Sequence, residues 1–361
     1  MVAGIVKQNL KKGEKEMKKR IFLVLAVSTI VFSLLAGANP ATAPAQPKVI
    51  HWKGQNAYPA GTSQGYGIHL AQWLDRISEG RLKLDIAPPG AIVPVGDMFD
   101  AVSKGILDFA GNYFAGYYMG KFPEQDVEAG LPFAYTSIED FWDLLYERGW
   151  FDIFQQVYAE KNIKWFPSTP TATYHLGAGF ELKSIRDLKG KKIRAVGTMA
   201  DYLKALGASP VYLPAPEIYM ASKLGTIDGC VFATDALDDF KLKEVWKSYI
   251  KDPNSSCLIT NYLINMDSWK KLPADLQARI QQEQRHADLE WTMHSSVLIR
   301  YSELRALRDF GVKPVFLPDS EKAEIMRIAL SIWDKTAAKS ARCAKLIDIL
   351  KAQARDLGRI K

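Results

Sequence analysis

The sequence is poor in cysteine, with three in 361 residues, and it lacks the short motifs that hold phosphate groups. Cys230, Cys257 and Cys343 are odd in number and widely spaced. This argues against a zinc site or a disulfide framework and favours buried free thiols, with one bridge as the alternative in an oxidising compartment. Neither G-x-x-x-x-G-K-[ST] nor G-x-G-x-x-G occurs, so the common nucleotide-binding loops are excluded.

The body of the chain also lacks a strong charge of either sign. The formal net charge is +7, but residues 1–20 contain seven basic and two acidic residues, and residues 21–45 contain no charge. Residues 46–361 therefore have a net charge of only +2. Such a surface has no strong field for phosphates, so we expect no nucleic-acid partner. The ordinary globular composition and the length predict two lobes.

The charged N-terminal segment has the form of an export signal. Lys18–Arg20 is basic, Ile21–Ala38 is apolar, and small residues follow. This order predicts a secretory signal peptide that starts at Met17 and is cleaved after Ala38 or Ala45, and hence a periplasmic protein. An uncleaved membrane anchor is the alternative, because the apolar run is about the minimum length for a membrane span.

Apolar periodicity predicts an α/β protein. Strands alternate with helices, which is typical of βαβ units and a mostly parallel sheet. The predicted strands are 49–54, 81–86, 107–110, 163–166, 174–178, 192–196 and 227–233. The last hundred residues are mainly helical, with one helix from about 271 to 310, broken near Leu272–Pro273, and another from Pro318 to about Lys351. Long helices of this kind are suited to bracing two lobes.

We therefore expect four segments. Residues 1–45 form an N-terminal extension and signal peptide, 46–168 form lobe I, and 169–258 form lobe II. Residues 259–361 supply a crossover strand and the C-terminal helices that brace both lobes.

A short internal repeat supports two similarly built lobes. The pattern Met98-x-x-Ala101-x-x-x-Gly105-x-Leu107-Asp108 returns 120 residues later, from Ile218 to Asp228. Each copy reads as a helix, a glycine at its C-terminus and a strand that begins with Asp. The alternative is that any helix–glycine–strand corner looks like this.

The motifs for catalysis and metal binding are weak. Residues 61–65 match the G-x-S-x-G pattern of serine hydrolases, but residues 56–60 separate them from the preceding strand, and the nucleophile elbow needs a strand that leads directly into the turn. Among the five histidines, only His286 and His294 share a helix face, and they have no third ligand. We therefore expect no enzyme, no cofactor and no metal site.

Arg194 is the most informative single residue. It lies within the predicted strand 192–196, and a guanidinium on a central strand is costly unless an anion meets it. Its planar fork matches a carboxylate, and Gly197 leaves space at the carboxyl end of the strand, where open α/β sheets bind ligands. An internal ion pair with Asp or Glu is the alternative interpretation.

Aromatic residues follow several of the same strands. Tyr58 and Tyr66 follow the first strand, Phe232 follows 227–231, and Tyr113, Phe114, Tyr117 and Tyr118 follow 107–110. Each alone is best read as core packing. Because strand ends meet at one edge of a sheet, their shared position predicts a cleft for a small organic anion around Arg194.

The chain resembles the solute-binding proteins of TRAP (tripartite ATP-independent periplasmic) transporters over nearly all of its mature length. The most specific stretch is Ser184–Arg194, and further similar stretches are Leu206–Val211, Pro216–Tyr219, Gly225–Gly229 and Phe99–Asp108. The resemblance implies a two-lobed periplasmic binding protein fold that closes around a small organic acid. A long helix spans both lobes, and the bound protein delivers its ligand to a membrane permease.

The resemblance also assigns roles to residues. Arg194 takes the place of the family's carboxylate-binding arginine. His175 stands where members that bind 2-oxo acids have a Gln that contacts ligand and metal, and Val231–Phe232 stand where they have a metal-binding Glu followed by Trp. Because these residues differ, we expect no metal ion at the site. The expected ligand is an organic monocarboxylate or a related acid. The predicted ligand-binding residues are Arg194, His175, Phe232, Tyr117, Tyr113, Asp235 and Tyr58.

Three functions follow from these observations. The first is a periplasmic protein that binds a carboxylate and serves the permease subunits of a TRAP transporter, as a monomer or dimer. The second is a secreted hydrolase, and the third is a binding module that senses its ligand and signals to a receptor.

Overall fold

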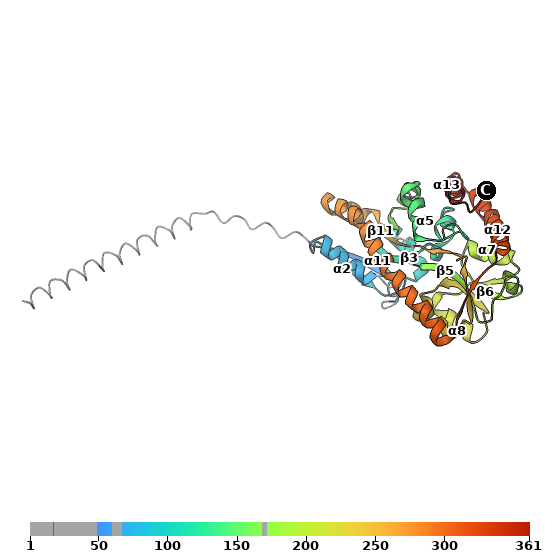
Figure 1. Cartoon of the computed structure of the whole chain (residues 1–361). Coiled ribbons are helices and arrows are strands. Elements are labelled where there is room, and N and C mark those ends of the chain that lie inside the picture. The colour runs from blue at the N-terminus through green and yellow to red at the C-terminus, as the bar shows by residue number, and fades with distance from the viewer. Residues whose placement is uncertain (1–16, 18–48, 60–66, 168–171) are drawn as a thin grey trace, which may run out of the picture. The chain divides into compact units, whose positions relative to one another are not determined.

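The structure is a computed structural model that describes Met17 and residues 49–59, 67–167 and 172–361. Residues 1–48 and 49–361 form separate units, and the second unit is described below (Figure 1). The predicted signal peptide, Tyr66 and the G-x-S-x-G pattern lie outside the described residues. Among the residues described, no helix has the length and apolar content needed to cross a bilayer.

Two mixed sheets organise the unit. The first sheet has the order β2-β1-β3-β11-β4, and the second has the order β12-β9-β5-β8-β6-β7, with β10 paired to β5. The strands of the first sheet are β1 (Ile50–Asn56), β2 (Leu82–Ala87), β3 (Phe109–Phe114), β4 (Ile163–Pro167) and β11 (Thr260–Asn265). Those of the second are β5 (Ala172–Ala178), β6 (Lys192–Arg194), β7 (Ser209–Val211), β8 (Gly229–Ala233), β9 (Ser248–Asp252), β10 (Ser256–Leu258) and β12 (Lys313–Phe316).

The expected mostly parallel arrangement is wrong. The β1–β2, β1–β3, β6–β7, β6–β8 and β9–β12 pairs are parallel, whereas β3–β11, β4–β11, β5–β8, β5–β9 and β5–β10 are antiparallel. The antiparallel pairs arise where the chain passes between the sheets, once from β4 to β5 and once from β10 to β11. Local periodicity does not reveal such a crossing, because the pairing partner lies far away in the sequence.

Helices cover both sheets. They are α2 (Gly67–Ile77), α3 (Met98–Ser103), α4 (Gln125–Glu128), α5 (Ile138–Trp142), α6 (Trp150–Ala159), α7 (Thr198–Ala205), α8 (Ile218–Lys223), α9 (Ala236–Asp239), α10 (Met266–Lys270), α11 (Ala274–Phe310), α12 (Asp319–Ala337) and α13 (Ala341–Asp356). The predicted single helix from Pro318 to about Lys351 is two helices. Ser340 ends the run by accepting a hydrogen bond from the backbone N–H of Cys343, as an N-cap does for a new helix.

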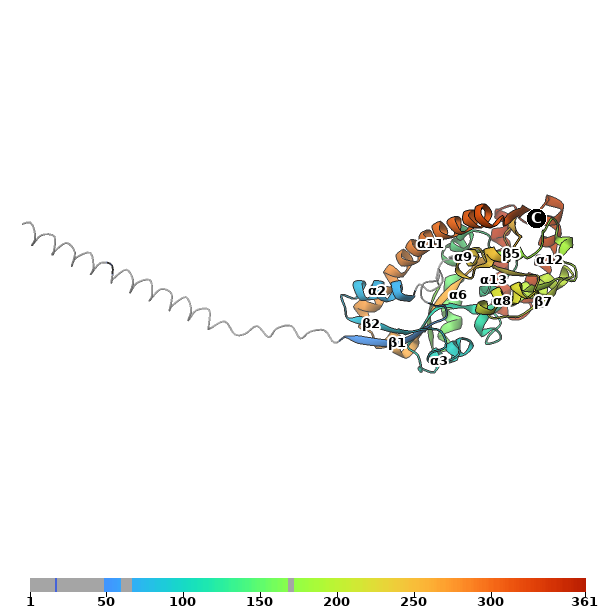
Figure 2. The same cartoon turned by 90° about the horizontal axis from the view of Figure 1, so that it is seen from below.

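Helix α11 braces the unit as expected. It has 37 residues, so at 1.5 Å per residue it is about 55 Å long. It contacts α2, which covers the first sheet, and also α9 and β5 of the second sheet (Figures 1 and 2). Its buried side chains Ile280 and Ala287 pack in the core of the first sheet, and Ala306 packs in a core of the second. One rigid element therefore touches both sheets.

The 120-residue repeat is a structural repeat. The short 3₁₀ turns η1 (Val95–Asp97) and η5 (Ala215–Glu217) precede α3 and α8 at the same offset, and β3 and β8 begin at the same offset. Asp108 accepts a hydrogen bond from the backbone N–H of Lys53 at 2.9 Å, and Asp228 accepts the equivalent bond from Lys192 at 2.7 Å. The two sheets therefore contain the same strand–helix–strand unit, in which Lys53 corresponds to Lys192.

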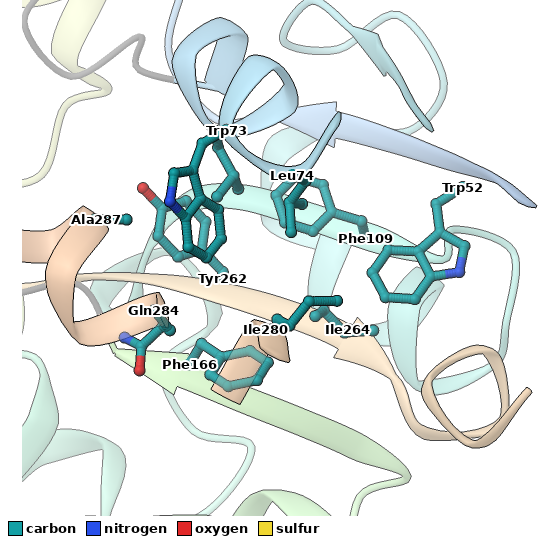
Figure 3. A pocket seen from close by; sticks show the side chains of 11 residues that line it. Trp52, Trp73, Leu74, Phe109, Phe166, Tyr262, Ile264, Ile280, Gln284 and Ala287 are labelled. Atoms are coloured by element: carbon teal, nitrogen blue, oxygen red, sulfur yellow. The ribbon is translucent and has the colours of Figure 1, made fainter. Parts of the chain in front are cut away.

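A small apolar cavity lies between the first sheet and the helices α2 and α11 (Figure 3). Its volume is about 20 Å³, which is the room that one water molecule requires. Its lining is aromatic and aliphatic apart from Gln284, and it consists of Trp52, Leu70, Trp73, Leu74, Phe109, Phe166, Tyr262, Ile264, Ile280, Gln284 and Ala287. None of the predicted site residues lines this cavity, so we interpret it as a packing space.

Candidate ligand site

Arg194 is the last residue of β6, and its side chain is buried, with 4% of its surface exposed. Its Nε donates to the carbonyl oxygen of Leu213 at 2.9 Å, and its Nη1 lies 3.4 Å from the carbonyl oxygen of Val231. The guanidinium lies over the Phe232 ring, with Cζ 5.4 Å from the ring centroid. The positive charge is thus fixed in position by neutral partners.

No carboxylate forms an ion pair with Arg194 within the described ranges 49–59, 67–167 and 172–361. The internal ion pair that we weighed as the alternative is therefore not found there. Carbonyl oxygens neutralise no charge, and Nη2 has no hydrogen-bond partner among these residues. A buried guanidinium of this kind is suited to receive an anion from outside the protein.

The internal repeat shows how the Arg194 side chain is held in position. Its counterpart in the first sheet is Gln55, two residues after Lys53 as Arg194 is two residues after Lys192. Gln55 Nε2 donates to the carbonyl oxygen of Val93 at 2.8 Å, and Val93 is the counterpart of Leu213. Each side chain therefore holds the equivalent loop of its own sheet. Arginine does so with Nε and keeps its remaining N–H groups for other partners.

Tyrosines from both sheets lie within electrostatic range of the guanidinium. The Tyr117 hydroxyl donates to the Tyr58 hydroxyl at 3.2 Å, and Tyr174 of β5 packs edge-on against Phe114 with centroids 6.3 Å apart. Arg194 interacts electrostatically with Tyr58, Tyr117 and Tyr174. The structure therefore gathers Arg194, Phe232, Tyr58 and Tyr117 as predicted.

Burial raises the pKa of the hydroxyls of Tyr58, Tyr117 and Tyr174, despite the nearby Arg194 charge, which lowers it. All three therefore stay protonated at physiological pH and keep an O–H donor. A buried cation together with neutral O–H donors favours a bound anion over a bound cation.

For three predicted residues the structure gives interactions with groups other than the guanidinium. Tyr113 is fully buried, and its hydroxyl donates to the carbonyl oxygen of Val95 at 2.7 Å. Asp235 is buried just before α9 and interacts electrostatically with Tyr174. His175 is opposite Phe232 in the β5–β8 register, but both of its ring nitrogens contact protein groups.

The His175 ring is fixed as a neutral imidazole. Nδ1 is 2.9 Å from the carbonyl oxygen of Ile250, which can only accept, so Nδ1 has the proton and Nε2 accepts from the Thr173 hydroxyl at 2.8 Å. Burial is the main cause that lowers the His175 pKa to about 4, and the Lys251 charge lowers it further. His175 therefore adds no charge to the site near neutral pH.

Sequence reasoning missed Tyr174. It lies within a predicted strand, but its place beside Phe232, with ring centroids 5.8 Å apart, depends on the antiparallel β5–β8 pairing. Correct pairing of these two strands was the only signal that could have identified it. Of the cysteines, Cys230 and Cys343 are free and buried, as expected. Among the described residues, no group of three or more His, Cys, Asp or Glu side chains is placed to bind a metal ion.

A buried network of hydrogen bonds is centred on Glu128 at the first sheet. Glu128 accepts from the Tyr158 hydroxyl at 2.5 Å and from the Trp165 indole N–H at 2.9 Å. Tyr158 also bonds Tyr118, whose hydroxyl accepts from Asn261 at 3.2 Å. The network joins α4, α6 and η2 (Ala115–Tyr118) to β4 and β11, the two strands beside which the chain passes between the sheets.

Burial raises the pKa of Glu128 to about 7, although the two donated hydrogen bonds lower it. Between about pH 4.5 and 7 the folded protein therefore keeps a proton that the unfolded chain has released. We expect the free energy of unfolding to fall as the pH rises through this window, by about 3 kcal/mol from this group. Urea unfolding of wild type and Glu128→Gln at several pH values measures it, because glutamine does not titrate. A difference between the two proteins that stays constant from pH 4.5 to 8 would contradict the assignment.

Comparisons with known proteins identify the family of the chain. The sequence profile of DctP, described as bacterial extracellular solute-binding protein, family 7, matches residues 55–340. The chain belongs to this family. It is 27% identical over 346 residues to the monocarboxylate 2-oxoacid-binding periplasmic protein of Nostoc sp., and the match covers 93% of each chain. A solute-binding protein of Albidiferax ferrireducens is 25% identical, with 90% of this chain and 94% of that protein covered.

Solved structures of TRAP periplasmic solute-binding proteins share the fold. A TRAP periplasmic solute-binding protein of Pseudoalteromonas atlantica, with bound sodium and pyruvate, superposes with a TM-score of 0.77 at 22% identity, covering 86% of this chain and 96% of that chain. One of Chromohalobacter salexigens gives a TM-score of 0.74 at 23% identity, covering 86% and 97%. The expected two-lobed periplasmic binding protein fold with its long bracing helix is confirmed.

Proposed function

We propose that the protein captures a small organic monocarboxylate in the periplasm and delivers it, unchanged, to the permease subunits of a TRAP transporter. The observation that supports this most is the buried Arg194 guanidinium, which has carbonyl and aromatic partners but no carboxylate partner within the described residues. Family membership supports the role in solute binding, and the relatives named as periplasmic support the compartment.

Each element of the site has a role in this proposal. The free N–H groups of Arg194 bind the carboxylate, and charge-assisted bonds of this kind are about twice as strong as neutral ones. We expect the hydroxyls of Tyr58 and Tyr174, which come from opposite sheets, to donate to the ligand. Phe114 and Phe232 supply the apolar wall that excludes water from it. The ligand thereby links the two lobes and favours their closed arrangement, which is the state that the permease recognises.

We further propose that this carboxylate binds without a metal ion. Val231 has no donor atom in its side chain, the Phe232 ring packs on Arg194, and both His175 nitrogens have protein partners. These are the positions that the family resemblance assigns to metal binding in the members that bind 2-oxo acids. Solved structures of similar proteins contain small acids: pyruvate in one, pyroglutamate in a second and picolinate in a third.

The direct test is thermal unfolding with a panel of acids: acetate, pyruvate, pyroglutamate, picolinate and benzoate. A ligand present at 100 times its Kd should raise the free energy of unfolding by about 2.7 kcal/mol. The ligand should be recovered unchanged by mass spectrometry, and addition of EDTA should leave its affinity unchanged. Consumption of the ligand would instead support the secreted hydrolase. A binding module that only senses its ligand would pass this test but would not restore uptake in cells that contain the permease.

A further inference from the structure

The internal repeat places two exposed apolar side chains at equivalent positions beside the site. Ile92 and Tyr212 are 120 residues apart, and each directly precedes the residue whose carbonyl oxygen is held by Gln55 or Arg194. Their exposed fractions are 38% and 62%. We call Ile92 and Tyr212 the rim pair. Exposed side chains of this size contribute little to the core, so both are available to contact a ligand beside the site.

The loops that carry the rim pair both approach Tyr117. Tyr212 interacts electrostatically with the Tyr117 hydroxyl. On the other side, the Gln55 side chain accepts hydrogen bonds from the backbone N–H groups of Ile92 and Val93, at 2.8 and 3.1 Å. The turn η1 that follows contacts η2, and Gly96 lies beside the Tyr117 carbonyl oxygen. The loop that carries Ile92 and the loop that carries Tyr212 therefore both lead to Tyr117, one through its backbone and one through its hydroxyl.

The backbone of each rim residue is fixed, whereas its side chain is not. Arg194 holds the Leu213 carbonyl oxygen, so a carboxylate bound to the remaining N–H groups of Arg194 lies close to the backbone that presents Tyr212. The exposed Tyr212 ring can reorient without disturbing the core. It is therefore suited to cover the part of the ligand that extends beyond the carboxylate.

We propose that Ile92 and Tyr212 close over the body of the bound acid from the two lobes and select acids that have an aromatic or bulky apolar body. This inference rests on the proposed function, because it concerns the same ligand. It adds a substrate class: Arg194 recognises the carboxylate, and the rim pair distinguishes the remainder of the molecule. Apolar contacts that form only on closure slow dissociation more than they speed association.

The test measures Kd for acetate, picolinate and benzoate by calorimetry, and dissociation rates by stopped-flow fluorescence. Tyr212→Ala should weaken binding of benzoate and picolinate at least tenfold, mainly through faster dissociation, but weaken acetate less than threefold. Ile92→Ala should act in the same direction by about threefold. Tyr212→Phe should retain most of the affinity, because the ring provides the contact. Leu224→Ala is the matched control, since Leu224 is 73% exposed at the end of α8 in the same lobe.

The outcomes separate this inference from the proposed function. If Arg194→Gln abolishes binding while Tyr212→Ala and Ile92→Ala bind all three acids as Leu224→Ala does, the rim pair has no such role and the proposed function stands. An equal loss for acetate and benzoate in Tyr212→Ala also overturns the selectivity. If wild type binds none of the acids, or Arg194→Gln binds them normally, both proposals are wrong. Melting temperatures within 2 °C of wild type confirm that the variants are folded.

Discussion

Arg194→Gln should lose carboxylate binding by at least about 100-fold while the ligand-free protein unfolds almost as wild type does. The internal repeat makes this substitution informative, because the repeat already has a glutamine at the equivalent position, Gln55. Gln55 holds the Val93 carbonyl oxygen as Arg194 holds that of Leu213. Glutamine at position 194 should therefore keep the loop in place while it removes the charge and the Nη1 and Nη2 donors.

Arg194→Ala is the companion variant that removes both contributions. It should lose binding to the same extent, and it should also lower the free energy of unfolding by about 1 kcal/mol, because the Leu213 carbonyl oxygen loses its donor. Calorimetric titration with the acids and urea unfolding without them give the two readouts. If Arg194→Gln retains carboxylate affinity within threefold of wild type, Arg194 does not bind the carboxylate and the site has to be sought elsewhere.

Trp333→Ala should lower the free energy of unfolding by about 3–5 kcal/mol, a large part of the 5–15 kcal/mol typical of folded proteins. Trp333 lies on α12 and is fully buried in the largest core, and its indole N–H donates to the Pro132 carbonyl oxygen at 2.9 Å. Helix α12 also contacts α7, which follows Arg194 in the second lobe. Truncation leaves a cavity between these elements that packing cannot refill.

Two controls separate the parts of this effect. Trp333→Phe keeps an aromatic ring but loses the N–H donor, so about 1–2 kcal/mol is expected. Tyr301→Ala removes a side chain of similar size that is 54% exposed on α11, so its effect should remain within about 0.5 kcal/mol. Urea unfolding monitored by far-ultraviolet circular dichroism measures all three. A loss below 1 kcal/mol in Trp333→Ala would contradict the structural role given to this residue.

Local sequence patterns predicted most elements of the fold. Periodicity located most strands and most helices, because side chains of a strand alternate and those of a helix repeat every 3.6 residues, but it missed β9 and β10. The repeat from Met98 to Asp108 was recognisable because glycines with positive φ, Gly105 and Gly225, end both helices. Pairing was not predictable in this way. The antiparallel strands β5 and β11 changed an expected parallel sheet into two mixed ones.

The site shows the same division. The charge on a strand singled out Arg194, and the aromatic residues after the strands singled out Tyr58, Tyr117 and Phe232. The local pattern did not predict the groups around Arg194. Tyr174 reaches the site through antiparallel pairing, and the His175 ring is hydrogen-bonded to the carbonyl oxygen of Ile250, 75 residues away. Hydrogen bonds and burial across such separations depend on how the chain passes between the sheets.

By itself, the sequence determined the element types, the repeat and the near-neutral body behind a net charge of +7, and it singled out Arg194 as an arginine whose strand position predicts an anionic partner. These properties follow from residues close together in the chain and from their side-chain chemistry. The tertiary structure decided which groups meet that arginine. Only folding removes water from it and brings tyrosines of two sheets to the same place, because burial and proximity are properties of the packed molecule.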